Sequence, residues 1–210
     1  IKSYMRWTLI NKSTGVLTKE IDEANIDFYS RTMTGAIAQR PVDERALQVV
    51  NGTVGEALGK LYVEKKFPAE AKAIAKEMVD YVFLAFENRI NKLPWMTPAT
   101  RQGAIEKLRK STVKIGYPDK WEDYSSIQIK NYKNGGSLYS NVKNIGDFER
   151  MKALKDLNQK VDKSRWSMTP QTINAYYNPT ANEIVFPAAI LQAPFYDYKA
   201  SKAENYGGIG

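Results

Sequence analysis

The sequence contains neither cysteine nor histidine. Without cysteine it can form no disulfide and no thiolate metal site, which fits both a reducing compartment and a bacterial exported protein. Without histidine it lacks the usual general base near neutral pH and the commonest zinc ligand. Any catalysis by this chain would therefore depend on carboxylates, lysines or tyrosines.

Long apolar runs are also missing. No stretch approaches the ~18 consecutive apolar residues of a membrane-spanning helix, and residues 1–4 lack the charged start and apolar run of a signal peptide. The 210 residues nevertheless include 43% hydrophobic side chains. This content excludes disorder throughout and is enough for one ordinary domain or parts of two.

The chain carries a formal charge of +8, so a polyanionic partner has to be considered. The positive excess is spread along the chain, with +5 in residues 1–110 and +3 in residues 111–210. Lysines alternate with acidic residues at helical spacing, as in Glu64-Lys65-Lys66, which is typical of a solvated helix face. We therefore expect no nucleic-acid partner, and a basic nucleic-acid binder stays the weakest alternative.

Apolar residues at intervals of three and four predict helices through the first two thirds of the chain. One helix is predicted over residues 43–66, with an apolar stripe made of Leu47, Val50, Val54, Leu58 and Leu61. A second is predicted over residues 69–93, with an inner side made of Ile74, Met78, Val82, Ala85 and Phe86. A third runs from the Thr97 cap and Pro98 to about residue 110. Earlier helices are predicted at residues 1–11 and 18–33.

From residue 111 the pattern becomes mixed. Residues 113–118 alternate as a short strand does, and residues 142–157 have a helical pattern interrupted by Gly146. Residues 172–177 and 183–186 predict a β-hairpin closed by a loop over residues 178–182. The predicted fold class is mainly α with a small β-hairpin or sheet (α+β). Three tryptophans are interpreted as core anchors: Trp95, Trp121 and Trp166.

Three local patterns could carry chemistry. Residues 207–210 are rich in glycine, but no Lys-Ser/Thr pair follows and no buried strand precedes them, so nucleotide binding is not favoured. Glu183 and Asp197 could form an acid and base pair, although nothing in the sequence places them together. Asn174-Ala175-Tyr176-Tyr177 could bind a peptide at a sheet edge. From the residues alone, packing of these tyrosines in the core is the favoured alternative.

A series of spaced motifs, taken in order, resembles one family: the neprilysin-like zinc metallopeptidases of family M13, and within it the bacterial oligoendopeptidases. The resemblance spans essentially the whole chain. Its carriers are LYVEKKFP at 61–68, LPWM at 93–96 with Thr100 and Arg101, KIGYPD at 114–119, VDK at 161–163, NAYY at 174–177, NEIVFPA at 182–188, ILQ at 190–192, PF at 194–195 and NYGGIG at 205–210.

The resemblance implies a part of a two-domain, thermolysin-like metallopeptidase. Residues 1–61 would end the helical lid domain, residues 62–93 would connect the domains, and residues 94–210 would begin the catalytic domain. In the family the glycine-rich segment leads into the His-Glu-x-x-His helix, which supplies two zinc ligands and the general base. We therefore expect a fragment that ends just before that helix. The resemblance implies that zinc belongs to the intact enzyme, with its ligands beyond Gly210, and we expect this chain alone to hold no metal or catalytic residue and to be inactive.

The resemblance also assigns substrate-binding residues. Asn174, Ala175 and Tyr176 match the motif that holds the substrate backbone, and this favours the sheet-edge interpretation. Ile190 and Phe195 match residues that line the apolar pocket for the side chain after the scissile bond. The expected partners are oligopeptide substrates and the remainder of the same peptidase, and no segment of this chain is expected to span a membrane.

Two further expectations concern the protein's context. The absence of cysteine favours a bacterial source, because the eukaryotic extracellular members of the family are rich in disulfides. We expect a cytoplasmic location, with a secreted or cell-surface protein as the alternative. The alternative function is a non-catalytic helical module that binds a peptide or protein by strand addition. Because the elements match only part of a peptidase, we expect the chain alone to expose apolar faces.

Overall fold

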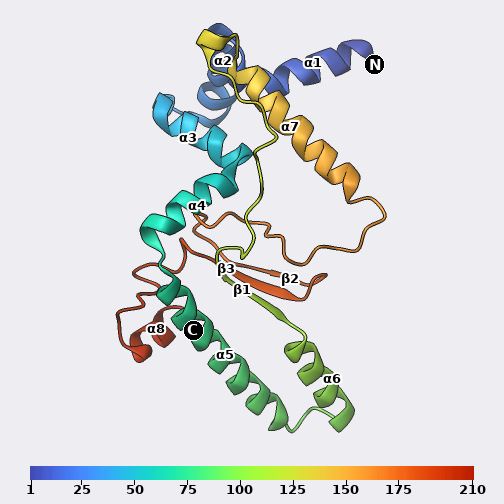
Figure 1. The fold of residues 1–210 in the computed structure, drawn as a ribbon, viewed down its shortest axis with the longest axis vertical. Coiled ribbons are helices and arrows are strands. Elements are labelled where there is room, and N and C mark those ends of the chain that lie inside the picture. The colour runs from blue at the N-terminus through green and yellow to red at the C-terminus, as the bar shows by residue number, and fades with distance from the viewer. The chain divides into compact units, whose positions relative to one another are not determined.

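The computed structural model describes residues 1–210, which form two compact units (Figure 1). The first unit comprises residues 1–54 and 123–161, and the second comprises residues 55–122 and 162–210. Each unit is therefore built from two separate stretches of chain. None of the helices combines the length and the apolar character that crossing a bilayer requires.

The first unit is helical, and it confirms the helices expected near residues 1–11, 18–33 and 142–157. The last of these begins earlier than predicted, because Ser137 and Ser140 form a capping box at its start. The elements are α1 Lys2–Ser13, η1 Thr14–Val16, α2 Lys19–Ile26, the π-helical turn η2 Asp27–Thr32, α3 Val42–Thr53, η3 Tyr132–Asn134 and α7 Leu138–Lys155.

This first unit has almost no apolar core. Ile145 is its only buried hydrophobic side chain, and residues 1–54 contain none. Trp7 and Leu47 are 58% and 54% exposed. A unit of this size normally buries a cluster of such side chains, so its apolar surface is open to another partner. The expectation of exposed apolar faces is confirmed.

The second unit is a small sheet packed against helices. Its elements are α4 Gly55–Lys66, α5 Ala69–Asn91, α6 Pro98–Arg109, β1 Thr112–Gly116, β2 Tyr176–Asn178, β3 Glu183–Pro187 and α8 Lys202–Gly208. The strand order is β1-β3-β2, with β1 parallel and β2 antiparallel to β3. The predicted strand and hairpin are confirmed, although β2 starts at Tyr176 rather than at residue 172. The preceding segment turns instead, since the Asn174 N–H donates to the Thr172 carbonyl at 3.0 Å.

The core of this unit lies between the first half of α5 and the sheet. Ala71, Ala75 and Val79 of α5 pack with Phe67 and Ile115 in one buried cluster. Tyr196 belongs to the same cluster although it lies 125 residues after Ala71 in the sequence. Its hydroxyl donates to the Ala71 carbonyl at 3.0 Å. Burial raises the pKa of Tyr196 to about 12, so this hydroxyl stays a hydrogen-bond donor at neutral pH.

The single helix predicted over residues 43–66 is wrong, because the chain forms α3 and α4 instead. Val54 leaves the helical region with φ −111° and ψ 40°, within the run Gly52-Thr53-Val54-Gly55 of weak helix formers. The apolar stripe predicted for this helix does not form a buried face either, since Leu61 is 58% exposed. The buried positions of α4 are Gly55, Gly59 and Val63. Gly59 faces Pro170 so closely that an added Cβ would lie 2.7 Å from its ring.

The inner side predicted for α5 is correct in its first half only. Met78 is buried and Ile74 packs on the core, whereas Ala85 and Phe86 are exposed. A helix of 23 residues is about 34 Å long. A five-residue strand such as β3 spans only about 17 Å. The sheet is therefore too short to cover the second half of α5.

The three tryptophans interpreted as core anchors differ in the structure. Trp121 stacks on Tyr117 with ring centroids 5.9 Å apart and packs against the core cluster. Trp166 is half-buried. Trp95 is 71% exposed, so its interpretation as a core residue is wrong. Trp95 lies in the turn between α5 and α6, beyond the part of α5 that the sheet covers.

Gly116 should be among the least replaceable residues of the second unit. It has φ +77°, and an added Cβ would lie 2.4 Å from the ring of Phe67, which is 1% exposed. We expect Gly116→Ala to lower the free energy of unfolding by about 2–4 kcal/mol through strain and overpacking.

The measurement is urea unfolding of the chain followed by tryptophan fluorescence. Gly103→Ala is the matched control, because Gly103 lies in α6 with no atom within 4 Å of the added Cβ. It should be neutral or stabilise by up to ~1 kcal/mol. Equal effects of the two substitutions would contradict the packing described here.

Candidate functional site

β2 is an edge strand. It pairs with β3 on one side, and no strand of the chain pairs with its other side. An edge of this kind presents backbone N–H and C=O groups that an extended peptide can join as an additional strand. The edge-strand geometry expected from the resemblance is therefore present, next to the residues that the resemblance assigned.

Asn174 lies two residues before β2 and is exposed. Its Oδ1 accepts a hydrogen bond from the Ala175 N–H at 2.8 Å, while its Nδ2 has no partner in the structure. The side-chain acceptor of Asn174 is thus engaged within the chain, and its side-chain donor is free. Asn174 forms no hydrogen bond to Ile190 or Phe195, so the structure does not join these assigned residues into one polar network.

The two tyrosines of the motif do not belong to the buried core. Tyr176 is half-buried, and its hydroxyl accepts a hydrogen bond from the Ser167 N–H at 2.9 Å. Tyr177 is 48% exposed, and its hydroxyl donates to Oδ1 of Asn182 at 3.0 Å. The core packing that the residues alone favoured is therefore wrong for these two rings, because β2 lies at the edge of a three-stranded sheet.

Phe195 and Ile190 lie in the segment between β3 and α8. Ile190 packs against the core cluster, and Phe195 is 46% exposed. The backbone of Phe195 is in close contact with α8, since a Cβ added to Gly208 would lie 2.4 Å from the Phe195 carbonyl oxygen. The buried Asn205 also holds this segment, through hydrogen bonds of 2.9 and 2.8 Å to the backbone of Asp197.

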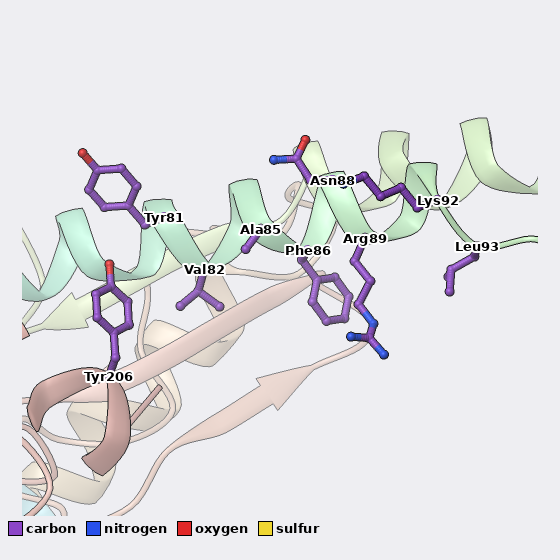
Figure 2. Close-up of a pocket in the computed structure, with 9 residues that line it drawn as sticks. All are labelled: Tyr81, Val82, Ala85, Phe86, Asn88, Arg89, Lys92, Leu93 and Tyr206. Atoms are coloured by element: carbon purple, nitrogen blue, oxygen red, sulfur yellow. The ribbon is translucent and has the colours of Figure 1, made fainter. Parts of the chain in front are cut away.

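A groove runs along the open second half of α5 (Figure 2), and we call it the α5 groove. Its volume is about 730 Å³, and Figure 2 shows Tyr206 of α8 facing the α5 side chains Tyr81 and Val82 at one end. A second cavity of about 400 Å³ shares Phe86, Arg89 and Leu93 with it and extends to β2. The sequence could not reveal the groove, because the apolar pattern of α5 is the same along its buried and open halves.

The residues present do not form a zinc site. The chain has no histidine or cysteine, and no group of three acidic side chains is close enough to hold a metal ion. Glu183 and Asp197 do not form the acid and base pair that was considered. Glu183 accepts a hydrogen bond from Lys114 at 2.6 Å, and Asp197 accepts one from the Lys199 N–H at 2.9 Å.

Comparison with known proteins assigns the family. Models of peptidase family M13 match residues 1–118 and residues 174–210. The chain belongs to peptidase family M13. The second match covers β2, β3, α8 and the segment that carries Phe195, so the residues of the candidate site fall within the part that the M13 model recognises.

Individual M13 relatives agree over the whole chain. A neutral endopeptidase from Lactobacillus helveticus is 37% identical over 211 residues, which is 100% of this chain and 32% of the relative. The zinc metalloprotease ZMP1 of Mycobacterium tuberculosis in its open state is 47% identical, with a TM-score of 0.87 over 98% of this chain and 31% of that one. PepO from Lactobacillus rhamnosis is 29% identical, with a TM-score of 0.84 over 95% of this chain and 31% of that one.

The chain spans about a third of the length of the curated relatives it matches. The structural likeness confirms the predicted fold class, which is mainly helical with a small sheet and matches part of an M13 zinc metalloprotease. The M13 resemblance seen in the motifs is likewise confirmed.

The absence of histidine and cysteine leads to a prediction about zinc binding. Sites made of carboxylates alone prefer hard ions such as Ca²⁺ or Mg²⁺ to zinc. We expect the chain, dialysed against a metal-free buffer, to retain no stoichiometric zinc by elemental analysis. One zinc ion per chain after dialysis would contradict the absence of a zinc site in these residues.

Proposed function

We propose that this chain is part of a zinc-dependent endopeptidase that hydrolyses oligopeptides, and that it supplies the edge strand on which the substrate binds. The observation that carries the proposal is the unpaired side of β2, with Asn174 exposed two residues before the strand. A peptide laid along this edge would gain backbone hydrogen bonds from the strand. The free Nδ2 of Asn174 would donate to a peptide carbonyl at the same place.

The M13 membership supports the reaction class, since matched relatives carry the names neutral endopeptidase and zinc metalloprotease. The zinc ion would supply the Lewis acid and the activated water of hydrolysis. Because the chain has no histidine or cysteine and no cluster of three acidic side chains, we infer that zinc ligands and the general base would come from outside these 210 residues. The contribution of this chain would be to bind and orient the peptide.

Phe195 supports an apolar side-chain pocket in the same proposal. Its ring is 46% exposed on a segment that contacts Gly208 and is held by Asn205, so it can contact a ligand without a change in the core. Ile190 packs on the core and would form the floor of such a pocket. Together they would accept an apolar side chain that follows the scissile bond.

The remainder of the peptidase is the proposed partner for the open apolar surface. The chain exposes 15,124 Å². Two separate compact domains of the same total mass would expose about 12,000 Å². We infer that further parts of the same protein cover the α5 groove and the apolar side chains of the first unit. In the intact enzyme, residues 1–61 would belong to the lid domain, residues 62–93 to the connection and residues 94–210 to the catalytic domain.

A non-catalytic module that binds peptides by strand addition is the second candidate. The absence of histidine and of a metal site favours it for the chain by itself. Both candidates use the same edge, and cleavage by the intact protein distinguishes them. The lack of cysteine supports a bacterial source. For location, we propose the cytoplasm, with secretion or the cell surface as the alternative.

Asn174 provides the direct test of the edge. We expect Asn174→Ala in the intact peptidase to lower kcat/KM about ten- to a hundredfold for all peptide substrates, because a lost backbone hydrogen bond of this kind costs ~1–3 kcal/mol. Asn174→Asp is the matched variant, since it keeps the acceptor for the Ala175 N–H and removes the donor. It should lose as much as the alanine variant. Full activity of either variant would refute the proposed role of the Nδ2 donor.

Phe195 should instead affect substrate choice. We expect Phe195→Ala to penalise peptides with a large apolar residue after the scissile bond more than those with a small one, because burial energy scales with the apolar area removed from water. The measurement is kcat/KM for a peptide pair that differs only at that position, with Phe195→Leu as an apolar control. Equal losses on both peptides would show that Phe195 lines no such pocket.

A further inference from the structure

A buried ion pair joins the two parallel strands of the sheet. Lys114 Nζ of β1 lies 2.6 Å from Oε2 of Glu183 at the start of β3, and the two side chains are only 8% and 4% exposed. The other ion pairs described in the chain have at least one partner that is far more exposed. Neither Lys114 nor Glu183 belongs to the proposed substrate site, so the pair requires its own explanation.

Lys114 makes a second contact that is not part of the sheet. Its Nζ also donates to the backbone carbonyl of Arg165 at 2.6 Å. Residues 162–175 carry no helix or strand, so backbone groups in this segment depend on such individual partners. Glu183 thus holds the ammonium group of Lys114, and the ammonium group holds the segment at Arg165.

The same segment is tied to the start of the edge strand two residues later. The Ser167 N–H donates to the hydroxyl of Tyr176 at 2.9 Å, and Tyr176 directly follows Ala175 of the substrate edge. A short series of contacts therefore leads from Glu183 through Lys114, Arg165 and Ser167 to Tyr176. Further along, the Pro170 carbonyl accepts from the Ala189 N–H at 2.9 Å, which fixes the other end of the segment.

Stability alone is a weak reason for this pair. Removing two charges from water is costly, and apolar residues of similar size often replace a buried pair without loss of stability. A charged donor fixed by a carboxylate does, however, specify one position for the carbonyl that it holds. The geometry therefore favours a role in positioning over a role in stability.

We propose that Lys114, fixed by Glu183, is a positioning residue for the substrate edge. It holds the segment at Arg165 so that Ser167 and Tyr176 keep Asn174 and Ala175 in line with a bound peptide. This inference rests on the proposed function, because the edge must bind substrate for its position to matter. Neither Lys114 nor Glu183 would itself contact the substrate.

The test compares two uncharged replacements of the pair in the intact peptidase. Lys114→Met with Glu183→Met removes both charges and every donor to the Arg165 carbonyl. Lys114→Gln with Glu183→Gln also removes the charges but keeps an amide donor at position 114. We expect the methionine pair to raise KM about tenfold with little change in kcat, and the glutamine pair to restore most of the lost affinity.

The division between KM and kcat separates positioning from a general structural role. Loss of folded enzyme lowers the active fraction, and hence kcat, at an unchanged KM. Tyr176→Phe, which removes only the hydroxyl contact to Ser167, should also raise KM. Lys110→Met with Glu106→Met is the control, because this pair lies on the exposed surface of α6 and should change neither constant.

The possible results separate the two proposals. An unchanged KM for the methionine pair, together with a raised KM for Asn174→Ala, would overturn the positioning role and leave the substrate edge intact. A decreased kcat at unchanged KM in both uncharged pairs would show a structural role only. If Asn174→Ala itself has no effect, the substrate edge fails, and the positioning role fails with it.

Discussion

The length of α5 relative to the sheet governs the second unit. A helix of 23 residues packs against strands of five residues or fewer, so the sheet can cover only its first half. That half carries Ala71, Ala75 and Val79 and forms the core with Phe67. The ring of Phe67 fits there because Gly116, which it contacts, has no side chain. The second half is also apolar; Ile90 is buried there, but Val82, Ala85 and Phe86 line the α5 groove. Core and groove therefore arise from one continuous helix pattern that meets a short sheet.

The sheet order has a second consequence, because it leaves β2 at an edge. β3 lies in the centre between β1 and β2, and contacts on both sides of it fix the hairpin. Asn182 connects the hairpin turn to α6, through a hydrogen bond of 2.9 Å from its Nδ2 to the Lys107 carbonyl. Lys114 and Glu183 connect β1 to the start of β3 and to the segment that precedes β2. The edge is thus open to a ligand on one side and rigidly supported on the other.

Local signals in the sequence predicted the elements well. Thr97 accepts the Thr100 N–H at 3.2 Å as an N-cap of α6, and the hairpin and β1 lie where alternation and turn residues indicated. The errors arise where packing partners decide the outcome. Nothing local shows that Gly59 packs on Pro170 while Leu61 faces outward, or that Trp95 lies beyond the sheet.

The candidate site was predictable only in part. The NAYY motif identified Asn174 through a family resemblance, but its spacing does not show that Oδ1 is engaged by the Ala175 N–H. Lys114 and Glu183 are 69 residues apart in sequence. Their pairing requires the parallel register of β1 and β3, which no pattern in the chain specifies. In the sequence, Asn205 and Gly208 belong to a glycine-rich run. In the structure, Asn205 hydrogen-bonds the backbone of Asp197 and Gly208 contacts the Phe195 backbone.

The central claim is that a peptide binds along β2 as an additional strand. Hydrogen exchange of the intact peptidase, with and without a bound peptide that is not cleaved, tests it most directly. We expect slower exchange of those backbone amides of β2, Tyr176–Asn178, that face away from β3 when the peptide is bound, because they become hydrogen-bonded and shielded from water. Unchanged exchange in this stretch, with slowing elsewhere in the presence of saturating peptide, would contradict the claim.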